Sequence, residues 1–215
     1  MSTEILTGEN ALQVDQAGLD SYLNHVLKRR SIRKLTAGPV SDETIRAIAE
    51  AGRWSASSGN SQPARIVILK ERNTDFWNFV EQTLSTKLQG EQLERAIARL
   101  AGYRSGVFTI VVYEDTTISH NPPAGFNPEL WKNFAAQALG IFQANLWNAI
   151  SAAGLGASNQ HINFQIEEEL RSFLHVPETW QSYCILPVGF PAETPAEGSR
   201  HPHEKVVFYE NGPAE

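Results

Sequence analysis

The chain has 215 residues, of which 41% are hydrophobic and 20% are charged, a balance typical of a folded globular protein rather than of a disordered or fibrous one. Its formal net charge of -6 argues against a surface for nucleic-acid phosphates, but it leaves room for a local basic pocket that takes one phosphate. The one cysteine, Cys184, excludes an intramolecular disulfide and argues against a cysteine-based metal site. Its apolar neighbours in the sequence predict a buried thiol in a reducing compartment.

The N-terminal segment and the most apolar stretch both indicate a soluble, cytoplasmic protein. Residues 1–16 contain acidic residues and lack the basic and apolar regions of a signal peptide, so we expect a flexible lead-in. Residues 134–156 are strongly apolar, but their glutamine and asparagine side chains would be costly in lipid. We therefore expect no membrane partner, and we expect residues 17–210 to form a single domain.

Apolar periodicity and turn-forming residues divide this domain into mixed helices and strands. Helices are predicted over residues 18–30, from 41 onwards, and over 74–100, 128–153 and 166–176. Strands are predicted over residues 64–70, 106–115 and 181–190, with 158–164 irregular or a short strand and 203–211 a last strand or extended arm. Residues 116–128 form a loop rich in proline, glycine and asparagine that is long enough to act as a functional lid. The pattern predicts one α+β domain.

Several chemistries lack the residues they need in this sequence. No serine stands in a nucleophile elbow, no HExxH motif or close Cys/His cluster is present, and no glycine-rich phosphate loop follows a strand. His201 and His203 form a pair in a polar loop, where such side chains are usually solvated rather than bound to metal. We therefore expect no metal, and the sequence does not support a hydrolase or an NTPase.

Three arginines, Arg29, Arg30 and Arg33, lie close together around Ser31. The dipole of the preceding helix explains one or two cations at its C-terminal end without any ligand. Planar guanidinium groups also suit phosphate and carbonyl-rich rings, so the cluster equally indicates a fixed anionic partner. The segment alone leaves both interpretations open.

Two loops of small residues are candidates for contact with a neutral, flat ligand. The first offers hydroxyls and carboxamides with little bulk, although such a loop can also be a simple connection. Its polar residues are Ser57, Ser58, Asn60 and Gln62. The second, Gly154–His161, has glycines that allow backbone to approach a ring closely, while His161 alone also suits a structural role. The predicted helix over 128–153 is apolar or small on all sides, which suits a core helix or one shared between two subunits.

In their order and spacing, these pieces resemble the nitroreductase family of flavoproteins. The motifs are RRS-x-R, then S-x-S-S-x-N-S-Q-P before a strand, then F-T-I-V-V-Y-E-D, then G-L-G-A-S-N-Q-H after the apolar helix, and a late P-V-G-F-P. The pattern runs from about His25 to Tyr209 and looks most similar to the compact branch that includes the yeast fatty-acid-repression and homologous-to-nitroreductase proteins. The resemblance implies a central, mostly antiparallel sheet flanked by helices, and a homodimer with a long shared core helix.

The resemblance also implies two FMN sites at the subunit interface, and it assigns roles to residues at matching positions. The flavin phosphate, ribityl chain and pyrimidine edge would be held by Arg29, Arg30, Ser31 and Arg33. The ring would be lined, from the partner subunit, by Ser57, Ser58, Asn60 and Gln62. Ring atoms N5 and O4 would face Ser158, Asn159, Gln160 and His161. Further basic contacts would come from Lys205 at the phosphate, with Arg200 as an alternative, and from Arg104.

The implied activity is that of an NAD(P)H-dependent flavin oxidoreductase. Hydride would pass from NADH or NADPH through flavin N5 to a small nitroaromatic or quinone-like acceptor in a ping-pong cycle, with no side-chain nucleophile and no catalytic residue of the chain itself. Aromatic side chains in the loops, namely Trp54, Phe126 and Trp131, would sandwich the acceptor. Two alternatives remain open: a flavin-binding redox or lipid-response regulator with little turnover, and an interaction module without flavin.

Overall fold

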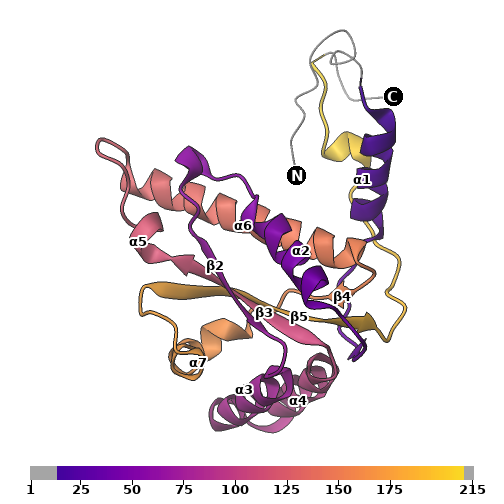
Figure 1. Cartoon of the computed structure of the whole chain (residues 1–215), viewed down its shortest axis with the longest axis vertical. Helices are drawn as coiled ribbons and strands as arrows, with labels where there is room; N and C mark the ends of the chain where they lie inside the picture. Colours follow the sequence, from indigo (N-terminus) through magenta and orange to yellow (C-terminus); the bar gives the residue numbers. More distant parts are fainter. Residues whose placement is uncertain (1–13, 211–215) are drawn as a thin grey trace.

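The computed structural model describes residues 14–210, and its centre is one five-stranded antiparallel sheet (Figure 1). The strand order is β1 (Leu35–Thr36), β5 (Trp180–Pro191), β3 (Phe108–Asp115) and β2 (Ala64–Leu69), and β4 (Gly156–Ala157) also pairs with β5. All of these pairings are antiparallel, which confirms the predicted sheet. Strands β2, β3 and β5 match the predicted ones, whereas β1 was not predicted because two residues carry no periodic signal.

Helices cover both faces of the sheet (Figure 1). One face carries α2 (Asp42–Arg53) and the long α6 (Pro128–Ala152), and the other carries α3 (Asn73–Lys87), α4 (Gly90–Arg104) and α7 (Glu167–Leu174). Helix α1 (Gln16–Lys28) stands at one end of the molecule and buries none of its residues. Within residues 14–210, none of the helices combines the length and the hydropathy that crossing a bilayer requires. Residues 1–13, most of the predicted lead-in, lie outside the described residues.

Side chains of strand β3 lie in two hydrophobic cores, because successive side chains of a strand point to opposite faces of the sheet. Phe108, Ile110 and Val112 join the core under α2 and α6, together with Cys184 of β5, whose predicted burial is confirmed. Val111 and Tyr113 join the core under α3, α4 and α7. A strand that is buried on both faces reads as a continuous apolar run, which explains why this one was evident in the sequence.

Three predicted elements differ from the structure. The single helix over 74–100 is two helices, since the chain turns at Gly90, whose φ of +56° is a left-handed conformation that favours glycine. The loop over 116–128 begins with a short helix, α5 (Thr116–Ser119), before α6 starts behind the cap residue Asn127. The last predicted strand is instead a 3₁₀ turn, η4 (His203–Lys205).

Two glycines fix the path of residues 29–34 between α4 and β4. An added Cβ atom at Gly156 would lie 2.9 Å from Cβ of Ile32, and one at Gly102 would overlap the backbone carbonyl oxygen of Arg33. The backbone N–H of Ile32 donates to the carbonyl of Ala157 at 2.9 Å, so the segment also adds to the sheet beside β4. The close approach to α4 therefore sets where Arg33 can lie.

Substitution of Gly102 by alanine tests this close approach. Alanine is the better helix former, by about 1 kcal/mol, yet we expect Gly102→Ala to lower the free energy of unfolding by about 1–3 kcal/mol because backbone atoms of Arg33 must move. Chemical denaturation measures the change. The exposed neighbour offers the control Ala101→Ser, expected within about 0.5 kcal/mol of the unsubstituted chain. A Gly102→Ala protein as stable as this control would contradict the argument.

Candidate functional site

The structure gathers the early arginines around one cavity of about 380 Å³, which we call the arginine cavity. Its basic and hydroxyl residues come from the segment after α1 and from the chain after β5. They are Arg29, Arg30, Ser31, Arg33 and Arg200. Residues 193–196 complete the wall. Four of the predicted site residues are therefore brought together, and Arg200 joins them.

Backbone hydrogen bonds hold the two sides of this cavity against each other. The N–H of Ala192 donates to the carbonyl of Lys34 at 2.9 Å. The carboxylate of Glu193 accepts from the N–H groups of Arg33 at 2.6 Å and of Lys34 at 3.1 Å. The hydrogen bond from the Arg33 N–H is the main reason that the pKa of Glu193 is lowered. The carboxylate therefore stays ionised and accepts hydrogen bonds from the backbone. The loop after β5 is thereby anchored beside the arginines.

The arginines of the cavity lack carboxylate partners among residues 14–210, since none of them forms a salt bridge there. Arg29 stacks on the Trp147 ring of α6, with 4.2 Å from its guanidinium carbon to the ring centre. Burial, and then the charges of Arg200 and Arg30, lower the pKa of Arg29. These cations repel one another, and Glu193, whose carboxylate lies in the cavity wall, forms no salt bridge with them and bonds to backbone N–H groups, so the cavity favours an anion such as a phosphate.

A second cavity of about 400 Å³, here the α4 cavity, lies between α4 and the segment that follows β4. Its apolar walls are Leu84, Leu88, Ala96, Leu100 and Ile162. Its polar groups are Gln92, Arg95, Arg99, Tyr103, Gln160 and Gln165. A half-apolar cavity with polar groups on its walls suits a flat ligand with a polar edge.

Gln160 links the predicted segment Ser158–His161 to the α4 cavity. Its backbone N–H and carbonyl both bond to Ile185 of β5 at 2.9 Å, and its side-chain amide donates to Oγ of Ser158 at 2.8 Å. In the same segment, the Nδ2 amide of Asn159 lies 3.1 Å from Nε2 of His161. Oδ1 of Asn159 is buried and has no hydrogen-bond partner among the described residues, so a donor group of a ligand could bond to this acceptor.

The α4 residues of this cavity were not predicted, because the polar middle of the predicted 74–100 helix indicated only solvent exposure. One signal was present in the sequence. Arg95, Arg99 and Tyr103 recur every four residues and so lie along one face of the helix. That face carries two arginines and then an aromatic ring, which is a pattern typical of a ligand wall as much as of a solvated surface.

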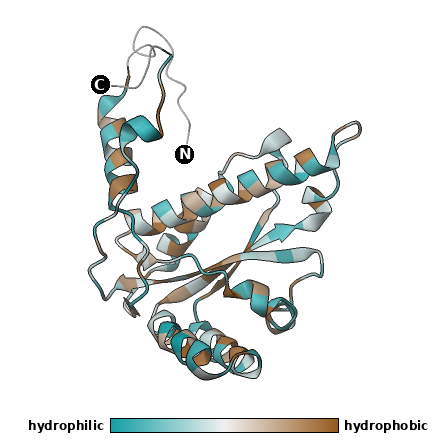
Figure 2. Cartoon of the chain, turned by 180° about the vertical axis from the view of Figure 1, so that it is seen from behind, coloured by the Kyte–Doolittle hydropathy of each residue, from teal (hydrophilic) through white to brown (hydrophobic). Residues whose placement is uncertain are grey.

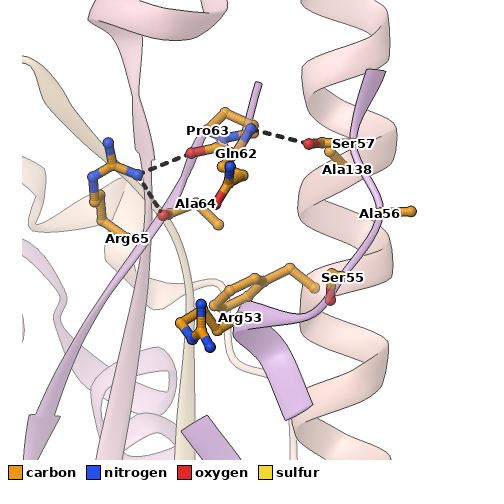
Figure 3. Close-up of a pocket in the computed structure, with 10 residues that line it drawn as sticks. Arg53, Ser55, Ala56, Ser57, Gln62, Pro63, Ala64, Arg65 and Ala138 are labelled. Atoms are coloured by element: carbon orange, nitrogen blue, oxygen red, sulfur yellow. Dashed lines mark hydrogen bonds between the residues drawn. The ribbon is translucent and has the colours of Figure 1, made fainter. Parts of the chain in front are cut away.

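The serine loop, residues 57–62, lies apart from the arginine cavity within the chain, since none of its residues lines that cavity. It forms a 3₁₀ turn over Ser58–Asn60, and Oγ of Ser57 accepts from the Gln62 N–H at 3.0 Å. Figure 3 shows the small cavity beside it, about 140 Å³, between the end of α2, the start of β2 and Ala138 of α6. Ala138 and Trp147, which mark the two sites on α6, are nine residues apart, or about 14 Å along the helix axis.

Two predicted basic contacts are elsewhere in the structure. Arg104, the last residue of α4, pairs with Glu81 in the middle of α3, so its charge is already matched, and it does not line either cavity. Lys205 lies in η4, which runs beside α1 in both views (Figures 1 and 2), and it does not line the arginine cavity. Arg200, the alternative, does line it. The turn at Gly90 and the fold of the C-terminal arm set the directions of Arg104 and Lys205, which the resemblance could not give.

The three aromatic side chains predicted to contact the acceptor differ in their exposure. Trp131 is only 6% exposed, and its ring N–H donates to the carbonyl of Ile118 at 2.9 Å, so it anchors α5 to α6. It is therefore placed in the core rather than in a position to sandwich a ligand. Trp54 and Phe126 are exposed, and Phe126 packs edge-on against Trp131 with 5.4 Å between ring centres.

Comparison with known proteins identifies curated relatives over most of the chain. The protein named as the nitroreductase HBN1 of Saccharomyces cerevisiae is 29% identical over 195 residues, which cover 87% of this chain and 97% of that protein. The NADPH-flavin oxidoreductase of Vibrio harveyi is 26% identical over 203 residues, covering 90% of this chain and 75% of that protein.

Known structures share the fold. The nitroreductase CinD from Lactococcus lactis, in complex with chloramphenicol, superposes with a TM-score of 0.77 at 26% identity and covers 89% of this chain and 98% of its own. A nitroreductase from Desulfovibrio desulfuricans in complex with FMN has a TM-score of 0.68 at 24% identity, with 89% and 98% coverage. The family model described as the nitroreductase family matches residues 26–190, more than half of the chain. This chain therefore belongs to the nitroreductase family.

Proposed function

We propose that this chain is an FMN-dependent oxidoreductase that takes hydride from NAD(P)H and passes it to a small nitroaromatic or quinone-like acceptor. The observation that carries the proposal is the arginine cavity, whose cations have no carboxylate partner among the described residues and which lies near a half-apolar cavity. Family membership supports the reaction class. CinD, which carries a nitroaromatic drug, supports the class of acceptor.

The residues present fit FMN in three respects. A single cationic cluster matches a cofactor with a single phosphate. The α4 cavity offers apolar walls for the face of a ring and polar groups for its edge. Among the described residues, the buried Oδ1 of Asn159 and the buried hydroxyl of Tyr103 make no hydrogen bond of normal length, and a ligand with both donors and acceptors would supply them.

When bound, FMN supplies the hydride acceptor and donor, while the chain supplies binding and electrostatics. Arg29, Arg30 and Arg200 hold the phosphate by charge-assisted hydrogen bonds. Arg33 and Arg99 place positive charge near the polar edge of the ring, which favours negative charge there in a partly dry cavity. No side-chain base is assigned, since solvent can supply the final proton. One open face would take the nicotinamide and the acceptor in turn, which gives a ping-pong order.

A homodimer completes the site in this proposal. Helix α1 exposes an apolar face made of Leu19, Tyr22, Leu23, Val26 and Leu27. Figure 2 shows this helix standing clear of the sheet, and the middle of α6 also exposes Ile141. Covering these surfaces with a second copy would bring that copy's serine loop to the arginine cavity of the first. The separation of the two half-sites along α6 supports this arrangement.

Loss of two arginines, one assigned to the phosphate and one to the polar edge of the ring, tests the cofactor site. We expect Arg29→Ala with Arg33→Ala to weaken FMN binding by on the order of 100-fold, because two charge-assisted hydrogen bonds disappear. Titration of the flavin-free protein, followed by FMN fluorescence, measures the affinity. The double variant Arg46→Ala with Arg72→Ala removes the same charge from residues that line neither cavity, and it should bind FMN normally. Full FMN affinity in the first variant would refute the assignment.

Anaerobic reduction tests the proposed reaction. The FMN-loaded protein should lose its yellow colour when NADH or NADPH is added and regain it when 4-nitrobenzoate or menadione follows. Comparison of the two nicotinamides identifies the donor. A protein that binds FMN but is not reduced by either nicotinamide would instead be the flavin-binding regulator with little turnover.

A charge on α1 tests the dimer. Leu23→Glu should give monomers in size-exclusion chromatography with light scattering, and it should weaken FMN binding together with the loss of dimer. Ser21→Glu adds the same charge to the opposite side of the helix and should leave the dimer intact. A monomeric unsubstituted protein that still binds FMN tightly would exclude the shared site.

A further inference from the structure

The hydroxyl of Tyr103 lies where the arginine cavity and the α4 cavity approach each other. Tyr103 lines the α4 cavity from the last turn of α4. Arg33 and Glu193 of the arginine cavity, and Arg99 of the α4 cavity, are close enough to act on the pKa of its phenol. The neighbouring Gly102 also packs against the backbone of Arg33, so this turn of α4 lies against the segment that carries the arginines.

The side chain of Tyr103 is only 1% exposed, and its hydroxyl makes no hydrogen bond of normal length among the described residues, although the Ser158 side chain lies near enough to lower the pKa of the phenol. Its ring is fixed against Trp77, with 5.1 Å between the ring centres. Trp77 is fixed in turn by Oγ1 of Thr109, which accepts from its ring N–H at 2.9 Å. A buried hydroxyl without a partner is costly, and proteins keep such groups mainly where a ligand or an ordered water satisfies them.

The chemistry of the hydroxyl indicates a donor role. Burial raises the pKa of Tyr103, more than the nearby Arg33 and Arg99 lower it, so the phenol stays protonated near neutral pH. A neutral phenol gives one directional O–H donor without adding charge. The guanidinium groups around it already supply positive charge. Tyr103 therefore adds a hydrogen bond with a fixed direction rather than further charge.

We propose that Tyr103 contacts the cofactor and donates a hydrogen bond from its hydroxyl to a carbonyl oxygen on the polar edge of the flavin ring. The proposal rests on the proposed function, because it takes FMN as the ligand of both cavities. The hydrogen bond orients the ring between the two cavities. It also stabilises the reduced ring, because the polar edge carries more negative charge after reduction.

Tyr103→Phe removes the hydroxyl and leaves the ring. We expect about five- to tenfold weaker FMN binding, the effect of one lost hydrogen bond, and a more negative reduction potential of the bound flavin. Fluorescence titration of flavin-free protein gives the dissociation constant, and a redox titration against reference dyes gives the potential. The flavin-free variant should unfold at the same temperature as the unsubstituted protein or at a higher one, since the lost hydroxyl had no partner.

Tyr113→Phe is a matched control. Tyr113 is also fully buried, its hydroxyl also lacks a partner, and it packs beside Trp180 without lining either cavity. This variant should bind FMN with an unchanged dissociation constant and potential. An equal loss of affinity in both variants would show a general packing effect and would overturn the proposal.

The remaining outcomes separate this inference from the proposed function. An unsubstituted protein that fails to bind FMN would refute the proposed function and this inference with it. FMN binding that is equal in the unsubstituted and Tyr103→Phe proteins would refute the inference alone, because an ordered water would then serve the hydroxyl. A Tyr103→Phe protein that does not fold would also refute it, because the hydroxyl would then have a structural partner.

Discussion

Several guanidinium groups share one cavity and form no salt bridge with a carboxylate of the described residues. Their positive charges therefore repel one another, and the rest of the site is arranged around this repulsion. The fold tolerates this repulsion because contacts of the backbone fix the positions of the arginines. Ile32 is bonded to β4, Arg33 lies against Gly102, and the carboxylate of Glu193 bonds to backbone N–H groups and forms no salt bridge with the guanidinium groups. An anion that enters the cavity relieves the repulsion, so binding energy is available there before any specific ring contact forms.

The two cavities and the serine loop are held by different parts of one scaffold. Strand β5 carries Gln160 on one side and the loop with Arg200 at its end, while α4 supplies the wall with Arg99 and Tyr103. Helix α6 spans the distance between Trp147, under Arg29, and Ala138, beside the serine loop. In the homodimer that we propose, the two half-sites that α6 separates within one chain would come together between two chains related by symmetry.

The sequence predicts those parts of the fold and of the site that depend on residues close together in the chain. The continuous apolar run of β3, the cap at Ser41 and the long α6 each carry a clear periodic or capping signal, and the arginine cluster was found because its residues are adjacent. Arg104 and Lys205 were assigned from the family resemblance, and the directions of their side chains depend on the turn at Gly90 and on the path of the C-terminal arm. Tyr103 was not predicted, because the role proposed for it depends on a cavity formed by distant segments, which one helix cannot reveal.

The most direct measurement of the central claim is a crystal structure of the protein with FMN bound. The account predicts the phosphate within hydrogen-bond distance of Arg29, Arg30 and Arg200, and the ring in the α4 cavity with the serine loop of a second chain against it. A phosphate bound away from these arginines, or a ring enclosed by a single chain, would contradict it.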